Sequence, residues 1–298
     1  MFHSFCEELI AQITVLVGED YDVRIRHVVK NNGVKLDGVV ILKKEENTAP
    51  TIYINEYFTQ YQEGRSMNSI VKEIIQITME EGEKIIPSIV PENLSFDYMK
   101  NKIIYRLVNY EKNKSELEKV PHIRYLDLAI TFHCLVKWEK VEIGTIRVNK
   151  EMMNQWQVTT KDLWELAKKN TPKLFPIQIR SMNEVIADLL KQEVGSLPFD
   201  HESLQSEMYV FTNKSGINGA SVLLYENAIS NFASSNQTDF YILPSSIHEV
   251  ILIPFQQNFS KKELNEMVND VNSTEVPTED ILSNRVYIYH RNKNAIEM

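Results

Sequence analysis

Residues 239–255, DFYILPSSIHEVILIPF, consist of two apolar runs separated by a short polar step. Short apolar runs bounded by turn residues are typical of buried strands. Pro244 and Pro254 close the two runs, and proline is disfavoured inside a central strand. The segment therefore predicts a buried pair of strands, interrupted where polar side chains reach a surface.

The N-terminal part of the chain combines helical and strand periodicities. Asn31-Asn32-Gly33 separates two alternating segments, and residues of this kind tolerate the positive φ of a tight hairpin. Ser66 is suited to cap a helix whose apolar residues recur at helical spacing. The predicted elements are a helix over 4–17, strands over 21–29, 34–42 and 51–55, and a helix over 67–78. We assign this helix–meander–helix unit to residues 1–110.

The central part predicts a sheet strand among short helices. Residues 125–137, YLDLAITFHCLVK, are too apolar on both faces for a surface strand, so we expect a central strand. Strand alternation separates His133 from Cys134, and Cys134 is expected to be a buried small hydrophobe. The helices predicted here are 150–156, 160–170 with Thr159 or Thr160 as cap, and 182–192.

The last part of the chain restarts the pattern after a linker predicted over 195–207. Strands are expected at 208–212, 221–225 and 285–290, and helices at 226–233 and 261–271. We divide the chain into an N-terminal unit over 1–110, a central α/β part over 111–195 and a C-terminal α+β unit over 208–298. The predicted class is α+β, with antiparallel or mixed sheets flanked by helices in two or three subdomains.

Composition narrows the range of partners and compartments. Lys and Arg total 32 against 41 Asp and Glu, a net charge of −9, which disfavours binding to a phosphate backbone. No apolar run is long enough to span a bilayer, so we expect no membrane partner. The start of the chain has acidic residues within its apolar stretch and fails as a secretory signal. With Cys6 and Cys134 as the two cysteines, we expect a soluble, cytoplasmic protein.

Common catalytic and cofactor motifs are absent from the sequence. It contains no phosphate-binding loop, no dinucleotide fingerprint, no nucleophile elbow, no HExxH and no CxxC. Nine glycines in 298 residues make a glycine-rich nucleotide cradle unexpected, and the seven histidines show no zinc-ligand spacing. We therefore expect no cofactor and no metal ion.

Ser246, His248 and Glu249 form the sharpest concentration of reactive side chains. A hydroxyl, an imidazole and a carboxylate close together suit proton transfer. On a strand, Ser246 and His248 would share one face and Glu249 would lie on the other. A catalytic triad also requires an orienting acid, which the sequence does not locate. The alternative is turn chemistry, in which the serines turn the chain after Pro244 and His248 caps or packs it.

A second set of candidate binding residues lies near the N-terminus. Arg24 and Arg26 alternate along one predicted strand, and Lys30 and Asn31 follow at the hairpin. They suit a solvated sheet face or a weak site for an anionic partner such as a nucleic acid.

Several strings along the chain resemble an uncharacterised bacterial family known only as a domain of unknown function. They are Lys30-Asn31-Asn32-Gly33, Thr51-Ile52-Tyr53, Pro121-His122 with Asp127-Leu128-Ala129, Ser245-Ser246-Ile247-His248-Glu249, and Leu282-Ser283-Asn284-Arg285-Val286-Tyr287. The pattern of Trp156, Leu163, Ala167 and Asn170, with Gly219-Ala220-Ser221 and Leu243-Pro244, is similar in layout to a second uncharacterised bacterial family. The resemblance implies a shared fold and no particular substrate, cofactor or catalytic residue.

Three functional hypotheses follow. The first is a binding or interaction protein without recognisable catalytic chemistry, whose partner is a protein or a small molecule. The second is a hydrolase-like enzyme that uses the Ser246, His248 and Glu249 region, and the third is a weak nucleic-acid binder.

Overall fold

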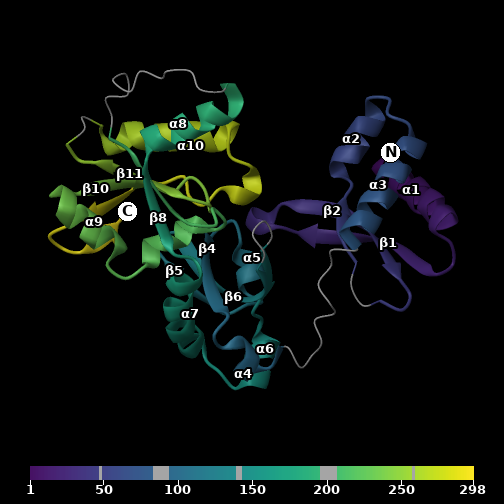
Figure 1. The fold of residues 1–298 in the computed structure, drawn as a ribbon, viewed down its shortest axis with the longest axis horizontal. Coiled ribbons are helices and arrows are strands. Elements are labelled where there is room, and N and C mark those ends of the chain that lie inside the picture. The colour runs from purple at the N-terminus through teal and green to yellow at the C-terminus, as the bar shows by residue number, and fades with distance from the viewer. Residues whose placement is uncertain (47–48, 83–93, 139–142, 195–206, 257–258) are drawn as a thin grey trace. The chain divides into compact units, whose positions relative to one another are not determined.

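The computed structural model describes residues 1–46, 49–82, 94–138, 143–194, 207–256 and 259–298. Contacts divide the chain into two compact units, Met1–Leu94 and Ser95–Met298. The sheets pair their strands in antiparallel fashion and helices flank them, which confirms the α+β class (Figure 1).

The first unit is a three-stranded meander covered by helices. Its strands are β1 (Tyr21–Val29), β2 (Lys35–Lys43) and β3 (Thr51–Tyr53), and its helices are α1 (Phe2–Val17), α2 (Asn55–Gln62) and α3 (Met67–Gly82). Leu9 and Ile13 of α1 and Ile70 of α3 are fully buried against Val39 and Ile41 of β2. The predicted hairpin is confirmed, because Asn32 and Gly33 take φ values of 58° and 73° between β1 and β2.

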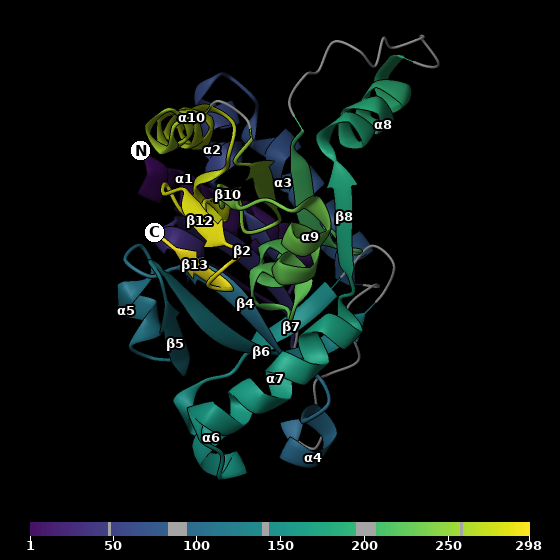
Figure 2. The ribbon, with the colours of Figure 1, turned by 90° about the vertical axis from the view of Figure 1, so that its left-hand side faces the viewer.

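A four-stranded sheet opens the second unit. Its strands are β4 (Ile103–Asn109), β5 (His122–Tyr125), β6 (Leu128–Trp138) and β7 (Ile143–Arg147). The central strand is β6, as the sequence predicted: β4 pairs along one edge, and β5 and β7 follow each other along the other. The accompanying helices are α4 (Phe96–Met99), α5 (Lys114–Leu117), α6 (Lys150–Trp156) and α7 (Thr160–Leu174). Figure 2 shows β5 and α5 at one side of this sheet and α7 at its lower end.

A six-stranded sheet of order β13-β12-β10-β11-β9-β8 completes the second unit. Its strands are β8 (Ile177–Ser181), β9 (Tyr209–Asn213), β10 (Phe240–Leu243), β11 (Val250–Pro254), β12 (Tyr287–His290) and β13 (Ala295–Glu297). The helices are α8 (Met182–Val194), α9 (Ala228–Asn236) and α10 (Lys261–Thr274). The pair β10–β11 lies inside this sheet, so the strand pair predicted for 239–255 is confirmed.

Both faces of the β10–β11 pair are covered. Leu264 and Val268 of α10 pack against Leu243 and Ile253 on one face. On the other face the Phe232 ring of α9 lies 4.9 Å from the Phe211 ring and 5.4 Å from the Phe240 ring. The strands are apolar on both sides because a helix covers each side.

The strand predicted over 221–225 is wrong. Residues Gly219–Leu224 form the 3-10 helix η4, which is buried from Gly219 to Leu223. A Cβ on Gly219 would lie 2.0 Å from Thr212 Oγ1 and 2.2 Å from the His248 carbonyl oxygen. Apolar residues in a short, fully buried helical turn show no amphipathic period, which explains why the sequence pattern favoured a strand.

The division into residues 1–110, 111–195 and 208–298 stays a prediction. The predicted linker is outside the described residues from 195 to 206. By pairing, β4 is joined to β6 along its whole length and so belongs to the unit Ser95–Met298.

Candidate functional site

One face of the four-stranded sheet carries a group of basic side chains. Arg106 of β4 lies opposite Thr131 of β6, and His133 of β6 lies opposite Arg147 of β7. Directly opposed residues of an antiparallel pair project to the same face, as do residues two apart on one strand. Arg106, His133 and Arg147 therefore share a face, and we call them the basic cluster.

His133 is the buried member of the basic cluster. The residue is 6% exposed, and Nε2 lies 3.0 Å from Thr131 Oγ1. The Thr131 hydroxyl donates to the Arg106 carbonyl oxygen at 3.4 Å, which leaves it as an acceptor for a proton on Nε2. Burial, and then the charges of Arg106 and Arg147, hold the pKa of His133 well below its usual range. The ring is therefore neutral and adds no charge to the cluster at neutral pH.

Arg106 keeps its charge in a partly buried position. Burial, and then the charge of Arg147, lowers the pKa of Arg106 to about 10, so the guanidinium stays protonated at neutral pH. Within the part of the chain that the structure describes, no carboxylate pairs with this guanidinium. Withdrawing a charge from water without an opposite charge is energetically costly.

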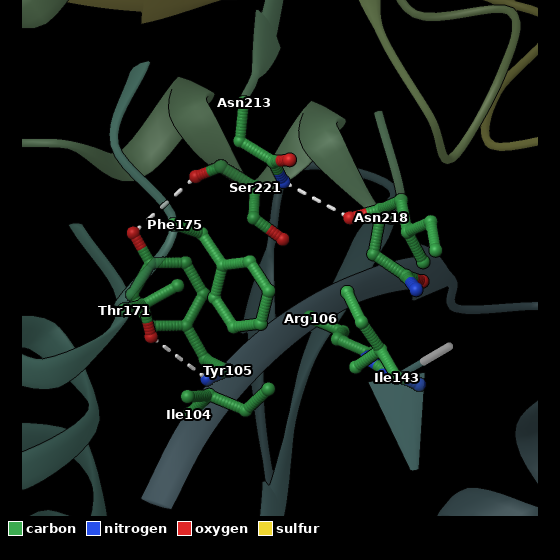
Figure 3. A pocket seen from close by; sticks show the side chains of 10 residues that line it. Ile104, Tyr105, Arg106, Ile143, Thr171, Phe175, Asn213, Asn218 and Ser221 are labelled. Atoms are coloured by element: carbon green, nitrogen blue, oxygen red, sulfur yellow. Dashed lines mark hydrogen bonds between the residues drawn. The ribbon is translucent and has the colours of Figure 1, made fainter. Parts of the chain in front are cut away.

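Arg106 lines a small hollow beside β4, the edge strand of the sheet (Figure 3). The wall is completed by Thr171 and Phe175 at the end of α7, Ile143 at the start of β7, and Asn218 and Ser221 around the start of η4. The lining thus combines apolar side chains with a few polar groups, as small-molecule sites commonly do.

Hydrogen bonds fix the walls of the hollow. The Tyr105 hydroxyl donates to the Ser221 carbonyl oxygen at 3.3 Å, and the Tyr225 hydroxyl donates to the Phe175 carbonyl oxygen at 2.7 Å. The Tyr105 amide donates to Thr171 Oγ1 at 3.0 Å, using a donor that an edge strand would otherwise leave unpaired. Burial raises the pKa of both tyrosines, so their hydroxyls remain donors at neutral pH.

Ser221 carries an unpartnered hydroxyl. The residue is 3% exposed, and its Oγ has no hydrogen-bond partner among the described residues. Figure 3 shows this side chain directed into the space between Phe175, Arg106 and Asn218. A buried hydroxyl without a partner costs about 1–3 kcal/mol, so it is uncommon without a functional or structural reason.

The loop between β9 and η4 positions Ser221. Asn213 Nδ2 donates to the Ile217 carbonyl oxygen at 2.9 Å, and Asn213 Oδ1 accepts from the amide and the hydroxyl of Ser215. The Ala220 amide then donates to the Ile247 carbonyl oxygen at 3.1 Å. The loop that forms the hollow is thereby bonded to the polar step between β10 and β11.

The structure places Ser246, His248 and Glu249 in a bend and not on a strand, with a single bridge from Ser246 to Ile281. Strand alternation therefore does not apply to the Ser246 and His248 side chains, and the turn alternative describes this segment. Ser246 Oγ instead accepts from the His248 backbone amide at 2.9 Å, a local bond that favours a turn over a strand. Glu249 is partly buried beside them.

His248 does meet an acid that sequence reasoning missed. Its Nε2 lies 3.4 Å from Asp280 Oδ1, and its Nδ1 lies 3.1 Å from the Gly216 carbonyl oxygen. The two side chains are 33% and 28% exposed. No sequence signal joins His248 to Asp280, because the contact depends on how the segment after α10 folds back.

In the first unit, Arg24 and Arg26 are exposed at alternating positions of β1. Arg24 Nη1 lies 3.7 Å from Asp22 Oδ2, and Lys30 Nζ lies 4.4 Å from the centre of the Tyr53 ring. Asn31 opens the 3-10 turn of the hairpin. The two arginines thus share the sheet face opposite the core, while Lys30 packs on an aromatic ring.

Sequence reasoning also missed Arg106 and Ser221. The sequence signal that could have found such a site is a polar or basic residue within an otherwise apolar strand. Arg106 in β4 and Thr131 and His133 in β6 are residues of this kind. Their convergence depends on pairing between strands and carries no local pattern.

A family of unknown function, DUF5688, matches residues 2–291, nearly the whole chain. The chain belongs to this family. The resemblance seen in the sequence is thereby confirmed, and the match extends across both compact units. No curated protein and no solved structure matches the chain.

Two of the strings that carried the resemblance to the family meet in the second unit. Asp127 Oδ2 accepts from Ser283 Oγ at 2.7 Å, and Asp127 Oδ1 accepts from the Tyr287 hydroxyl at 2.5 Å. Asn109 Nδ2 donates to the Leu282 carbonyl oxygen at 2.9 Å. These bonds join the four-stranded sheet to the chain entering β12 of the six-stranded sheet.

Neither a membrane-spanning helix nor a metal-binding group is found among the described residues. None of the described helices has the length and apolar character needed to cross a membrane. Over the same residues, no three His, Cys, Asp or Glu side chains are grouped so as to hold a metal ion.

Proposed function

We propose that this member of the DUF5688 family is a binding protein that holds a small molecule in the hollow beside β4, without catalytic chemistry of its own. The observation that carries the proposal is Ser221, whose buried hydroxyl has no partner among the described residues and is directed into the hollow. A bound ligand would supply the missing partner.

The lining supports binding over bond cleavage. Phe175 and Ile143 offer apolar contact, and Ser221 and Arg106 offer polar contact. Ser221 has no histidine or carboxylate in hydrogen-bond contact among the described residues, so it has no base to activate it as a nucleophile. Its role is that of a hydrogen-bonding group.

The test is a thermal-shift screen of small anionic, neutral and cationic compounds against the wild type, Ser221→Ala and Ser235→Ala. Ser235 is exposed on α9 and serves as the matched control. We expect compounds that stabilise the wild type and Ser235→Ala but stabilise Ser221→Ala much less. Ligand-free Ser221→Ala should be at least as stable as the wild type, since it removes an unsatisfied hydroxyl. A screen without any Ser221-dependent compound would contradict the proposal.

A hydrolase-like enzyme is the second candidate, favoured by the contact of His248 with Asp280. Its test is a panel of ester, phosphate and peptide substrates. Activity lost in His248→Ala and kept in His3→Ala would support it, since the His3 side chain is 88% exposed. Absence of hydrolysis across the panel would remove it.

Nucleic-acid binding is the third candidate, favoured by the exposed pair Arg24 and Arg26. This candidate is tested by the fluorescence anisotropy of labelled DNA and RNA at low salt. Binding to the two arginines should weaken steeply as the salt concentration rises. The same affinity in an Arg24→Ala, Arg26→Ala double variant would exclude this face as the site.

A further inference from the structure

We propose that the hollow beside β4 recognises a compact oxyanion, the phosphate or carboxylate group of a small molecule, and that Arg106 with the Ser221 hydroxyl binds it. This inference rests on the proposed binding function and names the chemical class of its ligand. It goes beyond that function, because a hollow of the same shape could hold a neutral molecule.

The charge of the basic cluster is the first argument. Arg106 and Arg147 are both cationic and close enough for Arg147 to affect Arg106, and both act on His133. Among the described residues no carboxylate pairs with Arg106. Charges withdrawn from water in proteins are normally paired, so Arg106 is suited to bind an anion beyond the described residues.

The geometry of the donors is the second argument. Arg106 and Ser221 both line the hollow, one from the sheet and one from η4 (Figure 3). A guanidinium presents parallel N–H donors that match two oxygens of a carboxylate or phosphate, and a hydroxyl can donate to a further oxygen. An oxygen of a bound anion would accept from the Ser221 hydroxyl, which has no partner among the described residues.

His133 adds no charge beside Arg106. Its Nε2 is engaged with Thr131 Oγ1 and its ring is neutral, so the positive charge of the basic cluster comes from Arg106 and Arg147. Arg147, exposed on the same sheet face, adds positive potential without lining the hollow.

The experiment measures binding of inorganic phosphate and of acetate by calorimetry and thermal shift, with chloride at matched ionic strength and neutral acetamide as references. Phosphate also stabilises proteins nonspecifically, so the readout is the difference between variants. Arg106→Gln removes the charge, and Arg124→Gln is the matched control. Arg124 is exposed on β5 of the same sheet and packs on the Tyr110 ring at 4.6 Å.

We expect phosphate, acetate or both to stabilise the wild type and Arg124→Gln, and Arg106→Gln to bind at least about 10-fold more weakly. A response to phosphate alone assigns a phosphate group, and a response to acetate assigns a carboxylate. Ligand-free Arg106→Gln should be as stable as the wild type, because no described residue loses a counter-charge.

Three results would overturn the inference. One is the absence of any Arg106-dependent response to phosphate and acetate. Another is a ligand-free Arg106→Gln that unfolds more easily, since the guanidinium would then be paired within the chain. The third is a set of neutral ligands that depend on Ser221 but not on Arg106, which would leave the binding function intact and remove only its anionic ligand.

Discussion

His248 contacts two oxygen acceptors, the Gly216 carbonyl through Nδ1 and the Asp280 carboxylate through Nε2. The Ser246 hydroxyl is occupied by the His248 amide. These contacts favour a role in holding the loop before η4 against the segment after α10.

Among single residues, the sequence identified His248 as notable for its neighbours and overlooked Arg106 and Ser221. The Ser246 hydroxyl and the His248 imidazole are close together in the chain, so they are noticeable without any tertiary information. Arg106 and Ser221 are far apart in the chain and become a site only because η4 lies against β4. The absence of a partner for a buried group is visible only in three dimensions.

The bond from Tyr287 to Asp127 makes a residue-scale prediction about stability. In Tyr287→Phe, the partly buried Asp127 carboxylate keeps the Ser283 donor but loses the Tyr287 donor. We expect a loss of about 1–3 kcal/mol in the free energy of unfolding, measured with urea. Tyr98→Phe is the control, since Tyr98 is 49% exposed and should change little. Equal stability of the two variants would show that Asp127 is not a structural tie.

His133 predicts a pH dependence. Its folded-state pKa is depressed, and the unfolded value is about 6.5, so the unfolded state binds more protons below that pH. Its contribution is therefore fully present above about pH 6.5 and is lost as pH falls, by at most about 1.4 kcal/mol per pH unit.

We expect the stability difference between wild type and His133→Gln to shrink from pH 8 to pH 5 in urea denaturation, because glutamine lacks the titrating group. His3→Gln is the control, with a highly exposed side chain. A difference for His133→Gln that stays constant over this range would contradict a buried, neutral His133.

At the scale of elements, α7 carries one wall of the hollow and depends on its N-terminal cap. Thr159 Oγ1 accepts from the Asp162 amide at 3.2 Å, and Asp162 Oδ2 accepts from the Thr159 amide at 2.8 Å, forming a capping box. We expect Thr159→Ala to lower stability by about 1 kcal/mol in chemical denaturation. Lys161→Ala, which leaves the cap intact, should change it far less, and similar losses in both would exclude the cap as the cause.

Elements with clear periodicity were predictable, and elements set by tertiary contacts were not. The helix that begins after Thr159 was predicted to end at residue 170, whereas α7 continues through Pro172 to Leu174. Packing against β4 extends it, since Thr171 accepts from the Tyr105 amide. The strand β8 was missed because its residues 177–181 gain strand character by pairing with β9.

For the whole molecule, the described contacts separate Met1–Leu94 from Ser95–Met298, each with its own buried core. We expect fragments 1–94 and 95–298 to fold separately, with cooperative thermal unfolding followed by circular dichroism. Fragment 111–298, cut at the boundary predicted from the sequence, lacks β4 and loses its pairing with β6. It should fail to unfold cooperatively, and cooperative folding of 111–298 alone would support the earlier boundary instead.

The family match spans residues 2–291 and therefore both units, while the hollow and the basic cluster lie entirely in the second. We therefore expect the proposed ligand to bind to Ser95–Met298. Net charge, which is −9 for the whole chain, gives no sign of a local cationic site.

A crystal structure of the protein grown with phosphate or acetate tests the central claim most directly. We expect an oxyanion in the hollow, with its oxygens about 2.7–3.1 Å from the Arg106 guanidinium and the Ser221 hydroxyl. A hollow without the anion, or an Arg106 guanidinium paired with a carboxylate of the same chain, would contradict it.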